Sequence, residues 1–389
     1  MRILHVADRL SDRGGADQYL RSLVARQSAI GPVHLAVGRV HGSARPVPGV
    51  ECTTVRGLDD AVRTRGAQLR KLEEVVGRVL PDILHGQNVM APDILDWLAT
   101  AGRLVVTVQD HRVFCPGQGK LTLAGEACTG AMSAERCRPC FEDGNYFESI
   151  FRLTQARLGA LSRAAAIVVL SEYMKRELAA VGIDRSRIHV VPPFPDLPVV
   201  DEATAPVPGP IVAVAGRLVR AKGVIDLVRA VAELRGVATP PTLVAAGEGT
   251  ALESMQSLAA ELGVPLVAPG WLGRSDLTAL MRRVTVVAMP SLWQEPFGIS
   301  GLEALSLGVP VVAYATGGIP EWLDGPGGSL VPRGQVSRLS RAIGRFLDDP
   351  DRSRLVGRQG AARVAATFAA EDSVARTAAV YRNVIEAGS

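Results

Sequence analysis

Two blocks of alternating strand and helix patterns, separated by a proline-rich segment, constrain the fold of this 389-residue chain most strongly. In the first block, short apolar runs alternate with amphipathic stretches such as residues 68–80, whose apolar side chains share one face at helical spacing. The predicted strands are 2–7, 33–38, 82–86, 103–110, 166–171 and 188–192, and the predicted helices include 16–29, 68–80 and 92–101. This alternation favours a parallel sheet covered by helices on both faces.

Seven prolines fall between Pro192 and Pro210, and this density is typical of a stiff linker. The alternation then restarts, with strands predicted at 211–216, 242–247, 265–268, 284–290, 309–315 and 328–331. We therefore predict an α/β protein of two doubly wound, Rossmann-like domains that face each other across a cleft. The predicted domains are 1–198 and 210–368, joined by a linker at 199–209. A C-terminal helix within 369–389 could pack back on the N-terminal domain.

Composition narrows the class of protein. Hydrophobic residues make up 47% of the chain and aromatic residues only 4%, which suits layered α/β cores. No apolar run reaches the roughly 20 residues that span a bilayer, and the N-terminus lacks signal-peptide regions, so we expect a cytoplasmic protein. The net charge is a mild +4, and no aromatic-plus-basic motif appears, which argues against nucleic acid as a partner. The basic stretch Arg63, Arg65, Arg70 and Lys71 is interpreted as a solvated helix face, with peripheral contact to the inner face of a membrane as the alternative.

The segment Glu295-Pro-Phe-Gly-Ile-Ser-Gly-Leu-Glu303 carries the strongest functional signal. A helix should begin near Gly298, and the amides at its start favour anionic groups. Gly298 and Gly301 would let a ligand approach the backbone closely. Glu295 is expected in the loop facing the cleft, and Glu303 on the helix, where a carboxylate can accept bonds from both ribose hydroxyls.

Two further glycine-containing segments follow predicted strands. Gly216-Arg217 ends the first strand of the second domain, and Lys222-Gly223 opens the next helix. Arg217 can bind phosphate with two N–H groups while Lys222 adds a point charge, so both suit a diphosphate and its departure as a leaving group. Gly14-Gly15 lies between the first strand and the first helix and turns main-chain amides toward the cleft, but it lacks the full dinucleotide pattern.

Taken together, these motifs resemble glycosyltransferase family 4. The resemblance covers residues 210–332 closely and includes Ala246-Gly247-Glu248-Gly249, Glu303-Ala-Leu-Ser-Leu-Gly-Val-Pro and Thr316-Gly-Gly-Ile-Pro-Glu321. It covers the first domain more loosely, through Gly14-Gly15 and residues 107–110. It implies a GT-B fold, a UDP- or GDP-sugar as co-substrate without a catalytic cofactor, and retention at the anomeric carbon. The first domain would then serve the acceptor, and the second would bind the nucleotide-sugar.

The resemblance also implies residue roles. Glu303 would bind the ribose, Arg217 and Lys222 the diphosphate, and Glu295 would lie near the donor sugar. The amides at the helix start, around Phe297, Gly298 and Ile299, would also hold the donor. Many members carry a cleft histidine where this chain has Gln109, and His111 follows two residues later. His111 is a candidate catalytic residue from a displaced position, or a loop-packing histidine.

Four of the five cysteines, Cys115, Cys128, Cys137 and Cys140, fall in one predicted insert, residues 111–145. In a reducing compartment such a cluster favours a structural metal site over disulfides. Four thiolates suit tetrahedral zinc or an iron–sulfur cluster. Two disulfides or free thiols are the alternatives, because the gap from Cys115 to Cys128 is not a standard zinc-ribbon spacing.

The sequence leaves the acceptor open, whether a small molecule, a lipid-linked molecule or a glycan, and it leaves the oligomeric state open. Two alternatives to a transferase remain at this stage. One is a nucleotide-sugar epimerase of the same fold, and the other is a non-catalytic nucleotide-sugar-binding protein. The intact set of Arg217, Lys222, Glu295 and Glu303 favours the enzyme.

Overall fold

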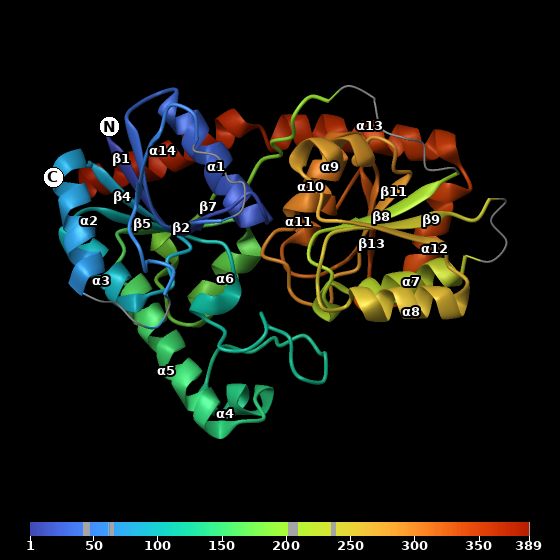
Figure 1. Ribbon diagram of the computed structural model, residues 1–389, viewed down its shortest axis with the longest axis horizontal. Helices are drawn as coiled ribbons and strands as arrows, with labels where there is room; N and C mark the ends of the chain where they lie inside the picture. The colour runs from blue at the N-terminus through green and yellow to red at the C-terminus, as the bar shows by residue number, and fades with distance from the viewer. Residues whose placement is uncertain (42–46, 61, 63–65, 201–208, 235–238, 389) are drawn as a thin grey trace. The chain divides into compact units, whose positions relative to one another are not determined.

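The computed structural model describes residues 1–41, 47–60, 62, 66–200, 209–234 and 239–388, which form two compact units (Figure 1). Unit 1 comprises residues 1–123, 128–193 and 370–389, and unit 2 comprises residues 124–127 and 194–369. The predicted linker at 199–209 falls largely outside the described residues. Each unit contains its own sheet and its own hydrophobic core.

Unit 1 is built on a parallel sheet of seven strands in the order β3-β2-β1-β4-β5-β6-β7. The strands are β1 (Ile3–Leu10), β2 (Val33–Val40), β3 (Glu51–Thr54), β4 (Ile83–Gln87), β5 (Leu104–Val108), β6 (Ala166–Val169) and β7 (Ile188–Val190). The helices are α1 (Gly15–Ser28), α2 (Gly66–Val79), α3 (Pro92–Ala101), α4 (Ala134–Cys137), α5 (Gly144–Leu161), α6 (Glu172–Ala180) and α14 (Ala370–Ala387), with the 3-10 turns η1 (His111–Val113), η2 (Arg138–Cys140) and η3 (Arg185–Arg187).

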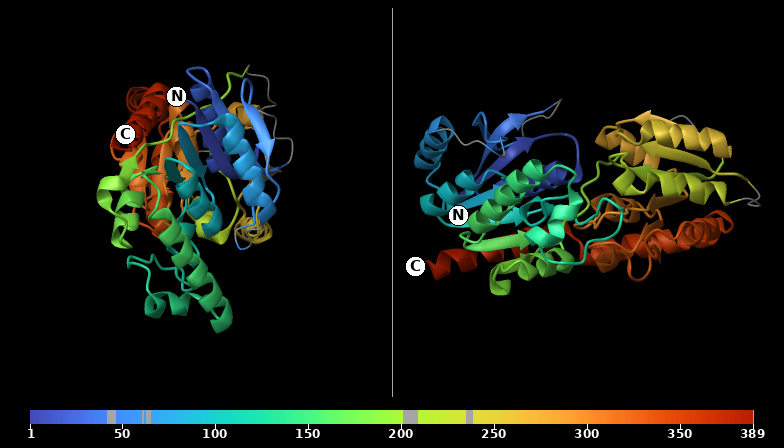
Figure 2. Two further views of the ribbon diagram at one scale, coloured as in Figure 1. Left: turned by 90° about the vertical axis from the view of Figure 1, so that its left-hand side faces the viewer. Right: turned by 90° about the horizontal axis from the view of Figure 1, so that it is seen from below.

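Helices cover both faces of this sheet. One face packs against α2, α3, α5 and α6 through a large apolar cluster that includes Leu72, Leu98 and Leu178. The opposite face packs in part against α14, through Val380, Tyr381 and Val384. Figure 2 shows α14 running along this sheet. Because β5 is buried along its whole length, its sequence is a nearly continuous apolar run rather than an alternating one. Strand β4 is equally buried but carries His85 and Gln87, which are hydrogen-bonded.

A buried polar network lies where α14 meets the sheet. The Tyr381 hydroxyl is hydrogen-bonded to His85 Nδ1 at 2.5 Å and accepts from the Gln27 amide at 3.2 Å. Gln27 also bonds to His5 at 2.7 Å, and His85 bonds to Thr107 at 2.7 Å. Burial lowers the pKa of His5 to about 4, so these imidazoles are neutral near pH 7 and act as hydrogen-bonding groups. The network therefore joins α14 to the middle of the sheet.

Unit 2 repeats the design with six parallel strands in the order β10-β9-β8-β11-β12-β13. The strands are β8 (Ile211–Ala215), β9 (Thr242–Ala246), β10 (Leu266–Gly270), β11 (Val286–Met289), β12 (Val311–Tyr314) and β13 (Gly328–Val331). The helices are α7 (Val224–Ala232), α8 (Leu252–Leu262), α9 (Arg274–Met281), α10 (Ile299–Ser306), α11 (Ile319–Leu323), α12 (Val336–Leu347) and α13 (Pro350–Thr367), with the 3-10 turn η4 (Arg220–Lys222).

The strand order fixes where each unit can bind a ligand. In unit 1 the chain runs outward from β1 to β3 and returns on the other side of β1 at β4. In unit 2 it runs outward from β8 to β10 and returns beside β8 at β11. The loops that leave the carboxyl ends of these two adjacent strands diverge, and the crevice between them is the usual ligand site of such sheets.

The sequence predicted the α/β class and most of the central strands, but it missed several peripheral elements. Strand β3 has the polar sequence Glu51-Cys-Thr-Thr54 and lies at the sheet edge, so it carries no buried apolar run. Helix α5 was also missed, and it extends from unit 1 with α4 and the cysteine-containing loop at its far end (Figures 1 and 2).

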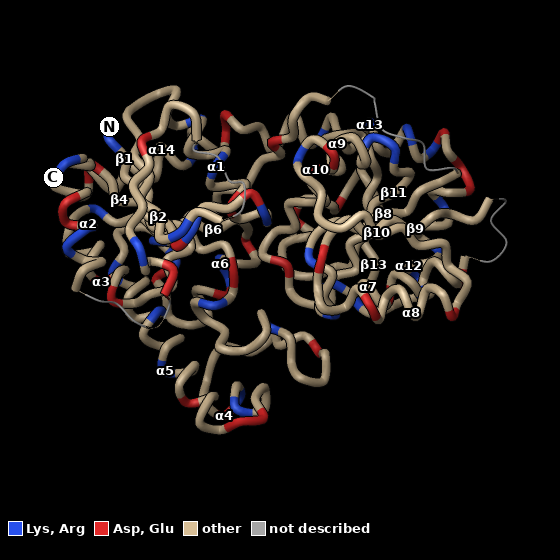
Figure 3. Tube along the Cα trace, in the orientation of Figure 1, with Lys and Arg blue, Asp and Glu red and all other residues tan. Residues whose placement is uncertain are grey.

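Charge is spread over the chain without a dominant block. Acidic and basic residues are interspersed along both units (Figure 3). Of the basic stretch singled out in the sequence, Arg63 and Arg65 lie outside the described residues, and Lys71 pairs with Glu74 on α2 at 2.7 Å. Within the described residues, no helix combines the length and the apolar character that crossing a bilayer requires.

The polar network predicts the effect of replacing Tyr381 with Phe. This change keeps the ring but removes the hydroxyl that bonds to His85 Nδ1 and accepts from the Gln27 amide, so the free energy of unfolding should fall by about 1–3 kcal/mol. Tyr146→Phe is the matched control, because Tyr146 is 60% exposed. Urea unfolding of the two variants should separate them, and equal stabilities would contradict a structural role for the network.

Candidate functional site

In unit 2 the loops that follow β8 and β11 meet through an ion pair. Lys222, in η4, places its Nζ 2.6 Å from Glu295 Oε1. The Ser291 hydroxyl donates to the same oxygen at 2.5 Å. The Glu295 side chain is only 4% exposed, whereas that of Lys222 is 25% exposed. Glu295 therefore fixes the position of an ammonium that remains partly exposed.

The backbone brings these two loops unusually close. Leu292 and Trp293 both donate their amides to the Ala221 carbonyl, at 2.8 and 3.1 Å. Gly223 has a φ of +67°, and a Cβ at this position would lie 1.7 Å from the Pro290 carbonyl oxygen. Only glycine fits there. The Lys222-Gly223 pair of the sequence is thus a structural requirement as well as a chemical one.

Electrostatics keep Glu295 ionised despite its burial. Burial by itself would raise its pKa, but the Lys222 charge and hydrogen bonds from Lys222, Ser291 and Trp293 outweigh it. The pKa of Glu295 is therefore held below its usual value. The pair is a fixed dipole at the carboxyl edge of the sheet.

Arg217 and Lys222 flank the same indole ring. The Arg217 guanidinium carbon lies 5.8 Å from the Trp293 ring centroid, and Lys222 Nζ lies 5.1 Å from it. Both distances fall within the range of cation–π attraction. Arg217 directly follows Gly216 and is exposed. Trp293 thus gathers two cations at the β8/β11 switch point, an arrangement suited to an anionic ligand.

Helix α10 begins beside these cations. Gly298 is its N-cap with φ +93°, and the Phe297 carbonyl before it accepts from Trp322 Nε1 at 2.6 Å. Phe297 is 2% exposed and packs against Trp322, so it anchors the helix start from the interior. Ile299 is the first residue of the helix. The first amides of a helix have no partner within it, so this end adds to the positive field.

Gly301 has a different role from the one predicted. We expected it to admit a ligand to the backbone. A Cβ there would instead lie 2.3 Å from Met289 Sδ and 2.3 Å from a ring carbon of Trp322. Gly301 is buried, and its missing side chain is what lets α10 pack against the sheet.

Glu303 lies in α10 and is paired with an arginine that the sequence did not single out. Arg274, at the start of α9, donates to Glu303 Oε1 at 2.7 Å and to the Asp196 carbonyl. Burial raises the pKa of Glu303, and Arg274 opposes this rise. The second oxygen, Oε2, is left for a further donor. Arg274 and Glu303 are 29 positions apart, so no local sequence motif indicated that they form a pair.

In unit 1, Gly14 has a φ of +93° and forms the N-cap of α1, with Gly15 as the first residue of the helix. His111, a candidate catalytic residue, is 2% exposed in η1. Its Nε2 bonds to the Tyr173 hydroxyl at 3.0 Å, and its ring packs edge-on against Phe114. His111 is thus placed in the interior of unit 1.

The four cysteines of the insert are free thiols. They lie near enough to raise the pKa of Cys137, in addition to the larger effect of burial. Among the described residues, however, no group of three or more His, Cys, Asp or Glu side chains is placed to hold a metal ion. The predicted zinc or iron–sulfur site at Cys115, Cys128, Cys137 and Cys140 is therefore not supported.

Hydrogen bonds hold this loop instead. Lys120 is 4% exposed, and its ammonium donates to the Gly130 carbonyl at 2.5 Å and pairs with Glu177 at 2.8 Å. The Lys120 amide donates to Cys115 Sγ at 3.4 Å, and its carbonyl accepts the Cys128 amide at 2.8 Å. Lys120 thus places a buried ammonium in the same loop as the thiols.

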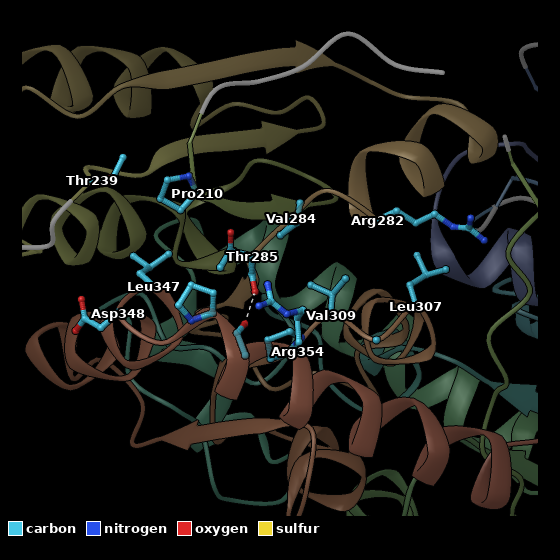
Figure 4. Close-up of a pocket in the computed structure, with 14 residues that line it drawn as sticks. Pro210, Thr239, Arg282, Val284, Thr285, Leu307, Val309, Leu347, Asp348 and Arg354 are labelled. Carbon is cyan, nitrogen blue, oxygen red and sulfur yellow. Dashed lines mark hydrogen bonds between the residues drawn. The ribbon is translucent and has the colours of Figure 1, made fainter. Parts of the chain in front are cut away.

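A cavity of unit 2 lies away from this cluster. It has a volume of about 680 Å³ and is lined by Pro210, Thr285 and Pro310, which precede β8, β11 and β12 (Figure 4). It is therefore at the amino edge of the sheet, opposite the cations. A cavity of about 490 Å³ in unit 1, lined by Leu104 and Ala166, also lies at the amino edge of its sheet. Because ligands of such sheets bind at the carboxyl ends, we place the functional site at Lys222 and Glu295 rather than in either cavity.

The ion pair predicts how Lys222→Met alters stability. The change leaves the buried Glu295 carboxylate without its partner cation, so the free energy of unfolding at pH 7 should fall by about 3 kcal/mol. Lys71→Met, which breaks the exposed pair with Glu74, is the control and should cost under about 1 kcal/mol.

The pH dependence of this loss follows from the depressed pKa of Glu295. Its contribution is complete above the usual glutamate pKa and is lost as the pH falls below it. The gap between wild type and Lys222→Met should therefore narrow in urea unfolding from pH 7 to pH 4. A gap that stays constant or widens would show that Glu295 is not the group involved.

Two sequence profiles match the chain in succession. The profile described as "Glycosyltransferase Family 4" matches residues 13–198, and "Glycosyl transferases group 1" matches residues 201–363. Together they account for most of both units. The Lys222, Glu295 and Glu303 cluster lies within the second match.

Two similar proteins illustrate the relationship. The 2-deoxystreptamine glucosyltransferase of Streptomyces kanamyceticus is 34% identical over 51% of this chain and 55% of its own. The MMP alpha-(1->4)-mannosyltransferase of Mycolicibacterium hassiacum is 32% identical over 58% of this chain and 53% of its own. The matched region thus spans about half the length of these curated relatives.

Solved structures share the fold over the full length. Sucrose-phosphate synthase from Thermosynechococcus elongatus has a TM-score of 0.76 at 18% identity and covers 100% of both chains. HepE of Anabaena, solved in complex with UDP and glucose, has a TM-score of 0.72 at 18% identity and covers 100% of this chain and 99% of its own. With two Rossmann-like units, this fold and both matching profiles, the chain belongs to the glycosyltransferases of family 4, with the GT-B fold.

Proposed function

We propose that this protein is an active glycosyltransferase that moves a sugar from a nucleoside-diphosphate donor to an acceptor hydroxyl or amine. The observation that carries the proposal is the Lys222–Glu295 ion pair at the β8/β11 switch point, with Arg217 beside it. Two cations and a helix start at the carboxyl edge of a parallel sheet make a site for a diphosphate.

Each side chain then has a part in binding the donor. Arg217, which is exposed, grips the diphosphate with two N–H groups, and Lys222 adds a point charge. Glu295 orients Lys222 from below. Glu303 accepts hydrogen bonds from the ribose hydroxyls at Oε2, while Arg274 donates to Oε1. The donor nucleotide stays open between UDP and GDP. HepE was solved with UDP. A mannosyltransferase of Mycolicibacterium smegmatis, 38% identical over 39% of this chain, is GDP-mannose-dependent.

The same groups can stabilise the leaving group. Negative charge grows on the diphosphate as its bond to the sugar breaks. Arg217, Lys222 and the start of α10 supply a fixed positive field at that point, which lowers the barrier without reorganisation. The chain therefore does not need a divalent cation for this step. We further propose that the sugar is transferred with retention of its anomeric configuration, a proposal that rests on family membership alone. The acceptor is a small molecule, a lipid-linked molecule or a glycan.

Replacing Arg217 with Met tests the donor site. Loss of a charged contact should weaken binding of UDP or GDP by about 10- to 150-fold, because such a contact contributes about 1.5–3 kcal/mol. Arg358→Met, on an exposed position of α13, is the control. Calorimetric titration should find wild-type affinity in the control only, and unchanged affinity in Arg217→Met would refute this placement of the diphosphate.

Glu303→Gln tests the ribose contact separately. The variant keeps the shape but loses the ion pair with Arg274 and the anionic acceptor. It should bind the nucleoside diphosphate more weakly than wild type while inorganic pyrophosphate binds equally to both. An equal loss for pyrophosphate would show that Glu303 acts through the phosphates or through folding rather than through the ribose.

The chemistry can be tested on the wild-type enzyme. With UDP- or GDP-sugars and a panel of acceptors, excess chelator should leave turnover nearly unchanged, and NMR of the product should show the anomeric configuration of the donor. Loss of turnover on chelation, restored by a divalent cation, would contradict the proposal that the step needs no divalent cation. An inverted product would contradict the proposed retention of configuration.

A further inference from the structure

Unit 1 has a switch point of its own, between β1 and β4, and three side chains with hydrogen-bond acceptors lie around it. Asp8 lies within β1, one residue beyond its last pairing with β4, and Asn88 and Gln109 lie just past the ends of β4 and β5. The register pairs Ala7 with Gln87 and Gln87 with Thr107. Asp8 and Asn88 therefore follow paired residues on β1 and β4, and Gln109 lies just beyond the end of β5. This is the edge at which such a sheet binds ligands.

Two of these side chains hold oxygens that lack a partner. Gln109 is 6% exposed, and its amide nitrogen donates to Gln87 Oε1 at 3.3 Å, while its own Oε1 is buried without a hydrogen bond. Asn88 Oδ1 is likewise buried without a partner, and its backbone has a φ of +56°, which is strained for a non-glycine residue. Unsatisfied buried acceptors are costly and rare, and they mark places where a ligand supplies the missing donor.

Asp8 is the third acceptor and the only one that can carry a charge. Its Oδ1 accepts the Met90 amide at 3.3 Å, across the gap between β1 and β4. Burial raises the pKa of Asp8 to about 7, and the Asp110 and Asp59 carboxylates add to the rise, whereas Arg112 and the Met90 amide oppose it. The carboxyl group is thus poised to ionise near neutral pH when a cation approaches.

The arginines around this edge are already engaged. Arg112 binds Asp110 through Nε at 2.8 Å and Nη2 at 2.6 Å. Arg157 donates to the Met90 carbonyl at 2.8 Å, and Arg9 pairs with Asp17 at 3.2 Å. Arg112 and Arg157 also interact electrostatically with Asp8. Within the described part of the chain, the edge therefore offers acceptors to a ligand, while these arginines are held by carboxylates and carbonyls.

We propose that this edge of unit 1 is an acceptor subsite for a polyol that carries a protonated amine. The ammonium pairs with Asp8, and Asn88 and Gln109 accept from neighbouring hydroxyl or ammonium groups. A phosphate monoester would meet acceptor oxygens and a carboxylate, so the site disfavours it. This assignment rests on the proposed transferase function and names the class of its acceptor.

Three cyclohexane polyols separate the chemistries: scyllo-inosamine carries an ammonium, scyllo-inositol only hydroxyls, and myo-inositol 1-phosphate a phosphate. Binding to the UDP-saturated protein is measured by calorimetry at pH 6 and pH 7.5. The amine should bind most tightly, and its affinity should rise about eightfold between these pH values as Asp8, with its pKa near 7, ionises. The affinity of the polyol should change little with pH.

Variants test which carboxyl is responsible. Asp8→Asn should remove the pH dependence of scyllo-inosamine binding and lower the affinity for scyllo-inosamine to that for scyllo-inositol. Asp93→Asn, on an exposed position of α3, should behave as wild type. UDP affinity should be the same in all three proteins, which reports on the donor site independently.

The outcomes are distinct. Tighter binding of the phosphate than of the amine, no preference for the amine, or equal behaviour of Asp8→Asn and Asp93→Asn would overturn the subsite while leaving UDP binding, and with it the proposed function, intact. Absence of binding of both UDP and GDP to wild type would overturn the proposed function itself, together with the acceptor role assigned to this edge.

Discussion

The Lys222–Glu295 ion pair is the interaction on which the functional geometry of unit 2 depends. It joins loops that leave the carboxyl ends of β8 and β11, which are adjacent in space and 73 positions apart at these residues. A buried carboxylate fixes the position of a partly exposed ammonium, and Trp293 holds a second cation next to it. The close approach needs Gly223, because any side chain there would collide with Pro290. Glycine, carboxylate and lysine are thus one structural unit.

Much of this could be predicted from the sequence, and the reason is periodicity. Parallel strands buried on both faces are largely apolar, so β5 and β12 stand out in the sequence. Residues that follow such strands must gather at one edge of the sheet, which is why Arg217, Lys222 and Glu295 could be named together. The partnership of Glu295 with Lys222, rather than with a ligand, was beyond the sequence because spacing does not reveal which side chains touch.

Other features follow from tertiary contacts that no local pattern reports. Arg274 reaches Glu303 from another helix, and Gly301 is small because Met289 and Trp322 need the space. The cysteine cluster was predicted as a metal site because four cysteines fall in one short insert. In the structure Lys120 supplies a positive charge within that loop, and the thiols are free. In unit 1, the acceptors at Asp8 and Gln109 could be recognised only when the strand order placed them at one switch point.

A crystal structure of the protein with a bound nucleoside diphosphate tests the central claim most directly. The account predicts that the diphosphate lies at the carboxyl edge of β8 and β11, within hydrogen-bond distance of Arg217 and Lys222, with the ribose against Glu303. The rival location is the cavity of about 680 Å³ at the amino edge, where Arg282 and Arg354 could offer charge (Figure 4). A diphosphate bound there, with Lys222 still paired to Glu295 and free of ligand, would contradict the account.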